Sequence, residues 1–110
     1  MLTISSQHTQ ACFDAWINCE NLLVKMASLK RELSKKVSKV IDECAMICMG
    51  TFHALKSCSE NSNRFALLCI GICEECAEVC EAQHENDFEV CAKACRICSN
   101  TISSLVKLAS

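Results

Sequence analysis

Cysteine is the residue of this 110-residue chain whose number and spacing could do chemistry. Four of the twelve cysteines follow one another at intervals of four, three and four residues: Cys69, Cys73, Cys76 and Cys80. At about 100° of rotation per residue, these positions share one face of an α-helix. The same intervals mark the core positions of helices that pack in bundles. We therefore expect the four thiols to point inward, into a common core.

Three further segments carry a similar face, and each contains cysteine. The positions that these faces share are Cys91, Cys95 and Cys98 in one segment, Val37, Cys44, Cys48, Thr51, Leu55 and Cys58 in another, and Cys12, Trp16, Cys19, Leu23 and Met26 in a third. Leucine, isoleucine and alanine fill a core without the risk of oxidation, although free cysteine also packs as a small hydrophobe. Repeated cysteine at core positions therefore indicates that the sulfur itself is used.

The composition favours an all-α fold and a single domain, residues 1–110. The chain has no proline, two glycines and no tyrosine, so it lacks the turn residues that a β protein of this length needs. Four apolar-periodic segments are predicted as helices: 4–27, 30–59, 63–85 and 87–108. Short connections make successive helices antiparallel neighbours, which predicts an antiparallel up-down-up-down four-helix bundle with a cysteine-lined core.

The boundaries of these helices have unequal signals. Ser62 and Asn63 supply capping side chains before the third segment, and Asn86 and Asp87 do so before the fourth. No glycine or proline marks the first turn, which we place between residues 26 and 34 by the symmetry of helix lengths.

The beginning of the chain predicts a cytoplasmic location. It carries neither a basic leader nor an apolar run with a small-residue cleavage site, so we expect no secretory signal. No window reaches the roughly 18 uninterrupted apolar residues of a membrane span, so we expect no membrane association. Cytosolic thiols are kept reduced, which favours metal binding over a disulfide framework.

Thiolates select soft metal ions, and here they favour Cu(I). Structural zinc takes closed sets of four ligands, and the cysteines do not divide into such sets in any evident way along the sequence. Cu(I) accepts two or three thiolates. If each thiolate bridges two ions, about one Cu(I) per thiol leaves the cluster neutral, which suits an apolar core. We therefore predict that the chain binds several Cu(I) ions.

Two other interpretations stay open. The pairs Cys76-x3-Cys80 and Cys91-x3-Cys95 resemble the twin CxxxC hairpins of small chaperones that are closed by two disulfides, and a redox-sensing protein would look similar. A Zn(II)-binding bundle is the other alternative. The CxxxCxxC spacing of radical enzymes that use S-adenosylmethionine also occurs twice, but those enzymes need a β/α barrel for which this chain is too short.

The charge and the remaining motifs exclude several classes of function. A net charge of −2 gives no electrostatic basis for binding nucleic acid. No Ser/His/Asp set, carboxylate pair or phosphate-binding loop is present, so we expect no enzymatic activity.

The rise of 1.5 Å per residue places the cysteines at predicted heights in the bundle. One level holds Cys19, Cys44, Cys76 and Cys95, and Cys48, Cys73 and Cys98 continue the column. His84 and Met26 are expected near one end, as auxiliary ligands where metal enters, and His8 and His53 near the other. Cys12 and Cys58 are expected to lie furthest from the column. The full set of candidate metal ligands is Cys12, Cys19, Cys44, Cys48, Cys58, Cys69, Cys73, Cys76, Cys80, Cys91, Cys95, Cys98, His84 and Met26.

Three stretches together resemble the cysteine-rich four-helix-bundle copper storage proteins of bacteria: ACFDAWINCE at 11–20, DECAMICMG at 42–50 and LCIGICEECAEVCEAQHENDFEVCAKACRICSNT at 68–101. The resemblance implies a homotetramer of bundles filled with Cu(I) through inward cysteines, cytosolic when no signal is present. A copper chaperone is then a candidate delivery partner. The chain departs from the family's pattern at Val37, Phe88 and Ile102, where cysteine would be expected.

Overall fold

The structure, a computed structural model, describes the backbone of residues 4–109 and the side chains of residues 4–106. Within that range the chain forms four α-helices and no strand: α1 (Ser6–Ser28), α2 (Lys35–Lys56), α3 (Ser62–Glu81) and α4 (Asn86–Ala109). The all-α prediction is confirmed, and each helix falls on a predicted segment. The main differences are that α2 is shorter at both ends and that α3 stops before the predicted residue 85.

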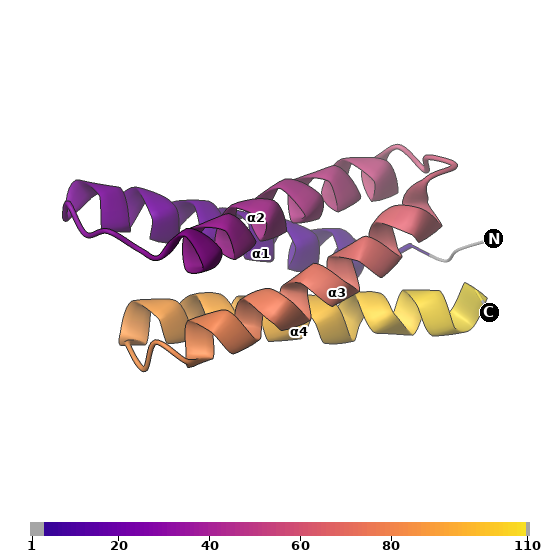
Figure 1. Cartoon of the computed structure of the whole chain (residues 1–110). Helices are drawn as coiled ribbons and strands as arrows, with labels where there is room; N and C mark the ends of the chain where they lie inside the picture. The colour runs from indigo at the N-terminus through magenta and orange to yellow at the C-terminus, as the bar shows by residue number, and fades with distance from the viewer. Residues whose placement is uncertain (1–3, 110) are drawn as a thin grey trace.

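The helices form an elongated bundle of 45 × 21 × 21 Å in which successive helices run in opposite directions (Figure 1). α1 packs against α2 and α4, and α3 packs against the same two helices. The connections 29–34 and 82–85 lie at one end of the bundle, which we call the turn end. The connection 57–61, the start of α1 and the end of α4 lie at the opposite end, which we call the terminal end.

All three connections contain a non-glycine residue with left-handed backbone geometry. These residues are Lys30, Cys58 and His84, with φ of 53°, 52° and 54°. After α1, the Arg31 N–H donates to the Met26 carbonyl at 2.9 Å, which closes the helix in the manner of a glycine cap. Glycine usually takes this position because it has no Cβ to clash. Its absence explains why the first turn left no signal in the sequence.

The side chains that cap the helix starts differ from those that the sequence predicts. α3 is preceded by Asn61, which makes no side-chain capping bond, so the predicted cap at Ser62 and Asn63 is wrong. The buried Ser62 hydroxyl instead bonds the carbonyls of Ser59 (2.8 Å) and Ala54 (3.1 Å), holding the end of α2 against the start of α3. A serine does cap α2, where Ser34 Oγ accepts the Val37 N–H at 3.2 Å.

Ion pairs join the two connections at the turn end. Arg31 donates two N–H groups to the Glu85 carboxylate, and the Lys25 ammonium lies 2.9 Å from an Asp87 oxygen. The Arg31 guanidinium also lies over the Phe88 ring, 5.6 Å from its centroid. These contacts connect the end of α1 and the turn that follows it to the start of α4 and the turn that precedes it.

Sulfur takes much of the space that aliphatic side chains fill in most bundles. Eleven of the twelve cysteines are buried with no more than 1% of their surface exposed. Aliphatic and aromatic side chains surround this sulfur and close its two ends. None of the helices in the described range combines the length and the apolar character that crossing a membrane requires.

Candidate metal centre

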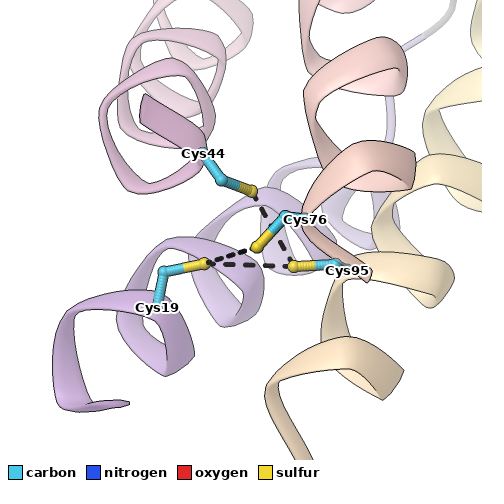
Figure 2. A group of neighbouring side chains, drawn as sticks. All are labelled: Cys19, Cys44, Cys76 and Cys95. Carbon is cyan, nitrogen blue, oxygen red and sulfur yellow. Dashed lines mark hydrogen bonds between the residues drawn. The ribbon is translucent and has the colours of Figure 1, made fainter. Parts of the chain in front are cut away.

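Four cysteines, one from each helix, meet at the middle of the bundle (Figure 2). Their sulfur atoms all lie within 4.8 Å of one another: Cys19, Cys44, Cys76 and Cys95. The helical rise places these residues at one height, and the structure agrees. We call this group the central tetrad. The contacts inside it measure 4.0 Å (Cys19–Cys76), 3.9 Å (Cys19–Cys95) and 3.8 Å (Cys44–Cys95).

A second group, the outer tetrad, lies next to the first toward the terminal end. It consists of Cys48, Cys69, Cys73 and Cys98, again with all sulfur atoms within 4.8 Å. The shortest contact is the 3.4 Å between Cys48 and Cys73, and Cys69 lies 3.6 Å from Cys98. Two sulfur contacts of 3.9 Å, from Cys44 to Cys48 and to Cys73, join the two tetrads.

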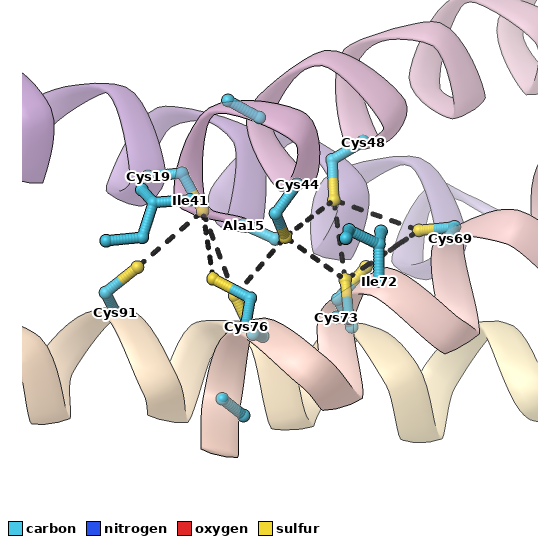
Figure 3. Packing of buried hydrophobic residues seen from close by; sticks show 14 of the residues in the cluster. Ala15, Cys19, Ile41, Cys44, Cys48, Cys69, Ile72, Cys73, Cys76 and Cys91 are labelled. Carbon is cyan, nitrogen blue, oxygen red and sulfur yellow. Dashed lines mark hydrogen bonds between the residues drawn. The ribbon is translucent and has the colours of Figure 1, made fainter. Parts of the chain in front are cut away.

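A group of three cysteines extends the sulfur toward the turn end. Cys76, Cys80 and Cys91 have their sulfur atoms within 4.8 Å of one another, and Cys91 lies 3.6 Å from Cys19. Figure 3 shows the resulting path of sulfur contacts, which runs without a break from Cys91 to Cys69. The ten cysteines of these three groups thus form one continuous column rather than separate sites.

The two cysteines expected furthest from the column have opposite outcomes. Cys12 is fully buried, and its neighbours Cys69 and Cys98 raise the pKa of its thiol. It therefore lies beside the outer tetrad, although it belongs to none of the groups whose sulfur atoms lie within 4.8 Å of one another. It is two helical turns from Cys19 on the same face and so reaches the outer tetrad. Cys58 is exposed, and the predicted face does not extend to it because α2 ends at Lys56.

Two large residues predicted on the inner face of α1 are displaced from it. Trp16 and Leu23 are only half-buried, whereas Ala15 and Leu22 are buried. Val37, predicted on the inner face of α2, is likewise only half-buried at the start of that helix. The buried positions of α1 keep the four-three intervals, but through a different set of residues: His8, Ala11, Cys12, Ala15, Cys19, Leu22 and Met26. A small residue at position 15 leaves room for sulfur from the opposite helices.

Met26 and His84 both lie at the turn end, in different surroundings. Met26 is 3% exposed and belongs to the core, whereas His84 is exposed in the left-handed turn before α4. At the terminal end, His8 is buried, and its Nδ1 accepts the Ser5 N–H at 2.9 Å in a capping box. His8 therefore has a structural partner, while the imidazole of His84 faces solvent.

Hydrogen bonds among the thiols pull their pKa values in opposite directions. Bonds with Cys44 and Cys48, followed by burial, raise the pKa of Cys73 far above its usual value of 9.0. Cys69 receives bonds from Cys12 and Cys48, which lower its pKa. Neighbouring S–H groups thus favour the thiolate form at some positions and oppose it at others. Ionising many of these thiols inside the apolar core requires bound cations.

All twelve cysteines are free thiols in the structure. The 3.4 Å between the sulfur atoms of Cys48 and Cys73 is far longer than the roughly 2.05 Å of a disulfide bond. The column offers buried soft ligands and excludes water. Its three ligand groups, among the residues that the structure describes, consist of cysteine alone, a ligand that suits soft cations.

Comparisons with known proteins agree with this geometry. No curated protein sequence matches the chain at a significant level. Among solved structures, the Cu(I)-bound copper storage protein BsCsp3 superposes with a TM-score of 0.82 and 26% sequence identity, covering 90% of this chain and 94% of that one. The sequence profile of Csp, the copper storage proteins, matches residues 3–107. The chain therefore belongs to the copper storage protein family.

Proposed function

We propose that this chain stores several Cu(I) ions on the thiolates of its eleven buried cysteines. The observation that carries the proposal is the continuous column, in which sulfur contacts of 3.4 to 4.0 Å link all four helices. The similar structure BsCsp3 is described as bound to Cu(I). The ligand set proposed is Cys12, Cys19, Cys44, Cys48, Cys69, Cys73, Cys76, Cys80, Cys91, Cys95 and Cys98.

Bridging makes a store of this kind compatible with a buried site. Cys44 has three sulfur neighbours within 3.9 Å, namely Cys48, Cys73 and Cys95, so one thiolate there is able to contact more than one ion. When each thiolate is shared between two Cu(I) ions, the ligand and metal charges cancel. A neutral cluster avoids the large cost of placing net charge in an apolar core.

We further propose that Cu(I) enters at the turn end. His84 presents a solvent-exposed imidazole there, and Met26 lies between that surface and the column. Both groups are neutral, and both bind Cu(I) less firmly than thiolate does. Cys80 and Cys91, the outermost buried cysteines of α3 and α4 at this end, would receive the ion next. Cys58, exposed at the opposite end, is assigned no part in storage.

The cellular setting belongs to the same proposal. We propose a cytosolic, non-enzymatic protein of one domain that assembles as a homotetramer and receives copper from a chaperone. Leu67, Leu68, Val90 and Ile97 are large apolar side chains more than half exposed, and they supply apolar surface for contacts between copies. Sedimentation equilibrium of the reduced chain tests the assembly: a tetramer is expected, and a monomer at all concentrations would contradict it.

Anaerobic titration of the reduced chain with Cu(I), against a chromophoric Cu(I) chelator, tests the storage function. We expect the number of tightly held ions to approach the number of buried cysteines. Cys58→Ser should leave that number unchanged, whereas Cys73→Ser should lower it because this sulfur contacts both tetrads. A capacity of only one or two ions would refute storage. Thiol counting before titration excludes the disulfide alternative if all twelve thiols react after denaturation.

A further inference from the structure

The central tetrad has the ligand set and the dimensions of a tetrahedral site for a divalent metal ion. Four thiolates placed about 2.3 Å from a zinc ion stand about 3.8 Å apart. Three contacts in the tetrad measure 3.8 Å (Cys44–Cys95), 3.9 Å (Cys19–Cys95) and 4.0 Å (Cys19–Cys76), and every pair lies within 4.8 Å. Small movements of the side chains would therefore close the four sulfurs around one ion.

The origin of the four ligands also suits a closed site. Each comes from a different helix, and Figure 2 shows their side chains converging on one space from four directions. All four are fully buried, so bulk solvent does not reach the four sulfur atoms. Four protein ligands without an open position are the arrangement of structural zinc sites. The expectation that the cysteines form no sets of four is therefore wrong, because it considered spacing along the sequence only.

Neighbouring thiols would offset the charge of such a site. Zn(II) binding replaces four S–H protons, which pass to solvent, and leaves a centre with a net charge of −2. Cys91 lies 3.6 Å from Cys19, and both Cys48 and Cys73 lie 3.9 Å from Cys44. These three thiols remain protonated and donate S–H hydrogen bonds to the ligand sulfurs. The buried charge thus has partners, which it needs in an apolar core.

The outer tetrad is a poorer site for the same ion. It takes two of its sulfurs, Cys69 and Cys73, from α3, and its Cys48–Cys73 contact of 3.4 Å is shorter than the edge that zinc requires. Filling it as well would place two dianionic centres in contact through Cys44 and Cys48. One zinc ion per chain, in the central tetrad, is therefore the favoured occupancy.

We propose that the copper-free chain binds one Zn(II) ion at Cys19, Cys44, Cys76 and Cys95, and that Cu(I) displaces this ion as the column fills. The zinc site itself does not depend on the proposed copper function, and only its displacement rests on that function. Bound zinc would link all four helices at the middle of the bundle before copper arrives.

The test uses the full-length reduced chain under anaerobic conditions, with Co(II) as a spectroscopic substitute for Zn(II). Titration with Co(II) should produce the visible bands of a tetrahedral thiolate complex, complete at one equivalent per chain, and one equivalent of Zn(II) should abolish them. The matched variants are Cys19→Ser and Cys12→Ser, both fully buried in α1. Cys19→Ser should weaken Zn(II) binding more than about tenfold. Cys12→Ser should bind as the unmodified chain does.

Circular dichroism of both variants is the control for folding: both should keep the helix content of the unmodified chain, so that a loss of binding is not due to a loss of helix. The proposal is overturned if the cobalt complex lacks tetrahedral bands, if two ions bind with equal affinity, or if Cys19→Ser and Cys12→Ser weaken binding equally. Adding Cu(I) to the zinc-loaded chain should release one Zn(II), detected with a zinc indicator. Normal Cu(I) capacity without zinc binding would refute this inference alone, whereas zinc binding without Cu(I) capacity would refute only the copper function.

Discussion

The two ends of the sulfur column are closed by different kinds of contact. At the terminal end, the column is closed by four buried side chains, of which three are aliphatic: Thr51, Leu55, Ile102 and Leu105. At the turn end, the seal is the ring of Phe88 together with Met26, and the groups outside it are the charged pairs of Arg31 with Glu85 and of Lys25 with Asp87.

We expect opening to cost less free energy at the turn end than at the terminal end. Opening the terminal end exposes several aliphatic side chains, each of which costs about 1.5–3 kcal/mol to transfer to water. Opening the turn end requires exposed ion pairs to exchange partners with water, which costs little, and one ring and one thioether to move. We therefore expect the terminal end to stay closed and the proposed entry of Cu(I) to take place at the turn end.

Ile102→Ala should show the largest effect, because it leaves a cavity in the sealed end. Loss of this fully buried side chain should lower the free energy of unfolding by about 2–5 kcal/mol. Anaerobic urea unfolding of the copper-free chain, followed by far-ultraviolet circular dichroism, measures the change. Val24→Ala, at a position 68% exposed on α1, is the control and should stay within about 0.5 kcal/mol. A cost below about 1 kcal/mol for Ile102→Ala would mean that the terminal end is not sealed.

Replacing both Met26 and His84 with leucine should slow copper exchange on the order of tenfold, the effect of about 1.4 kcal/mol on a barrier. The ion then loses its neutral ligands between solvent and Cys80 or Cys91. Stopped-flow loading, and removal by a strong Cu(I) chelator, measure the rates, while the final number of bound ions should remain nearly unchanged. His53→Leu, at the terminal end, is the control. Slowing in the control instead of the double variant would place the route at the opposite end.

Arg31→Gln should accelerate copper loading, by a smaller factor than the double replacement of Met26 and His84 slows it. It removes the paired contact to Glu85 and the cation over Phe88, so copper loading should become a few-fold faster. Raising the salt concentration should accelerate the unmodified chain toward the rate of the variant, because salt screens exposed charges. Lys39→Gln, which removes a longer 3.9 Å pair with Glu43 on α2, should leave loading unchanged. Equal rates for Arg31→Gln and the parent at low salt would contradict a role for this ion pair.

The smallest effect expected is a pH dependence of stability in acid. Hydrogen bonds from Arg31 and Arg96 lower the pKa of Glu85 and Glu81 below the usual 4.5. Because the folded-state pKa is the lower one, this stabilisation is present above pH 4.5 and is lost as the pH falls through the folded-state values. Urea unfolding between pH 6 and pH 3 should show a slight decline that is reduced in Glu85→Gln. An identical decline in that variant would assign the effect to other groups.

The periodicity of α3 and α4 was sufficient to predict their inward thiols, because seven cysteines at four-three intervals allow one buried face. The helical rise likewise placed Cys19 level with Cys95. The same rise placed all four members of the central tetrad on one level. The outer tetrad was predicted only in part, because Cys48, Cys73 and Cys98 were expected together but the place of Cys69 depends on how far each helix turns its face toward the axis. The burial of Cys12 depends on the same rotation of α1. Cys58 lies outside the column, as expected, because α2 ends at Lys56 without a glycine or proline to mark its end.

Because Cys58 is exposed and the other eleven cysteines are buried, the thiols of this chain should react with a reagent in two kinetic phases. A water-soluble disulfide reagent meets this one sulfur at the surface, whereas the eleven others react only when the bundle opens. The fast phase therefore counts one thiol and serves as an internal standard. The slow phase measures how often the bundle opens, and each copper ion bound to the column should lengthen it.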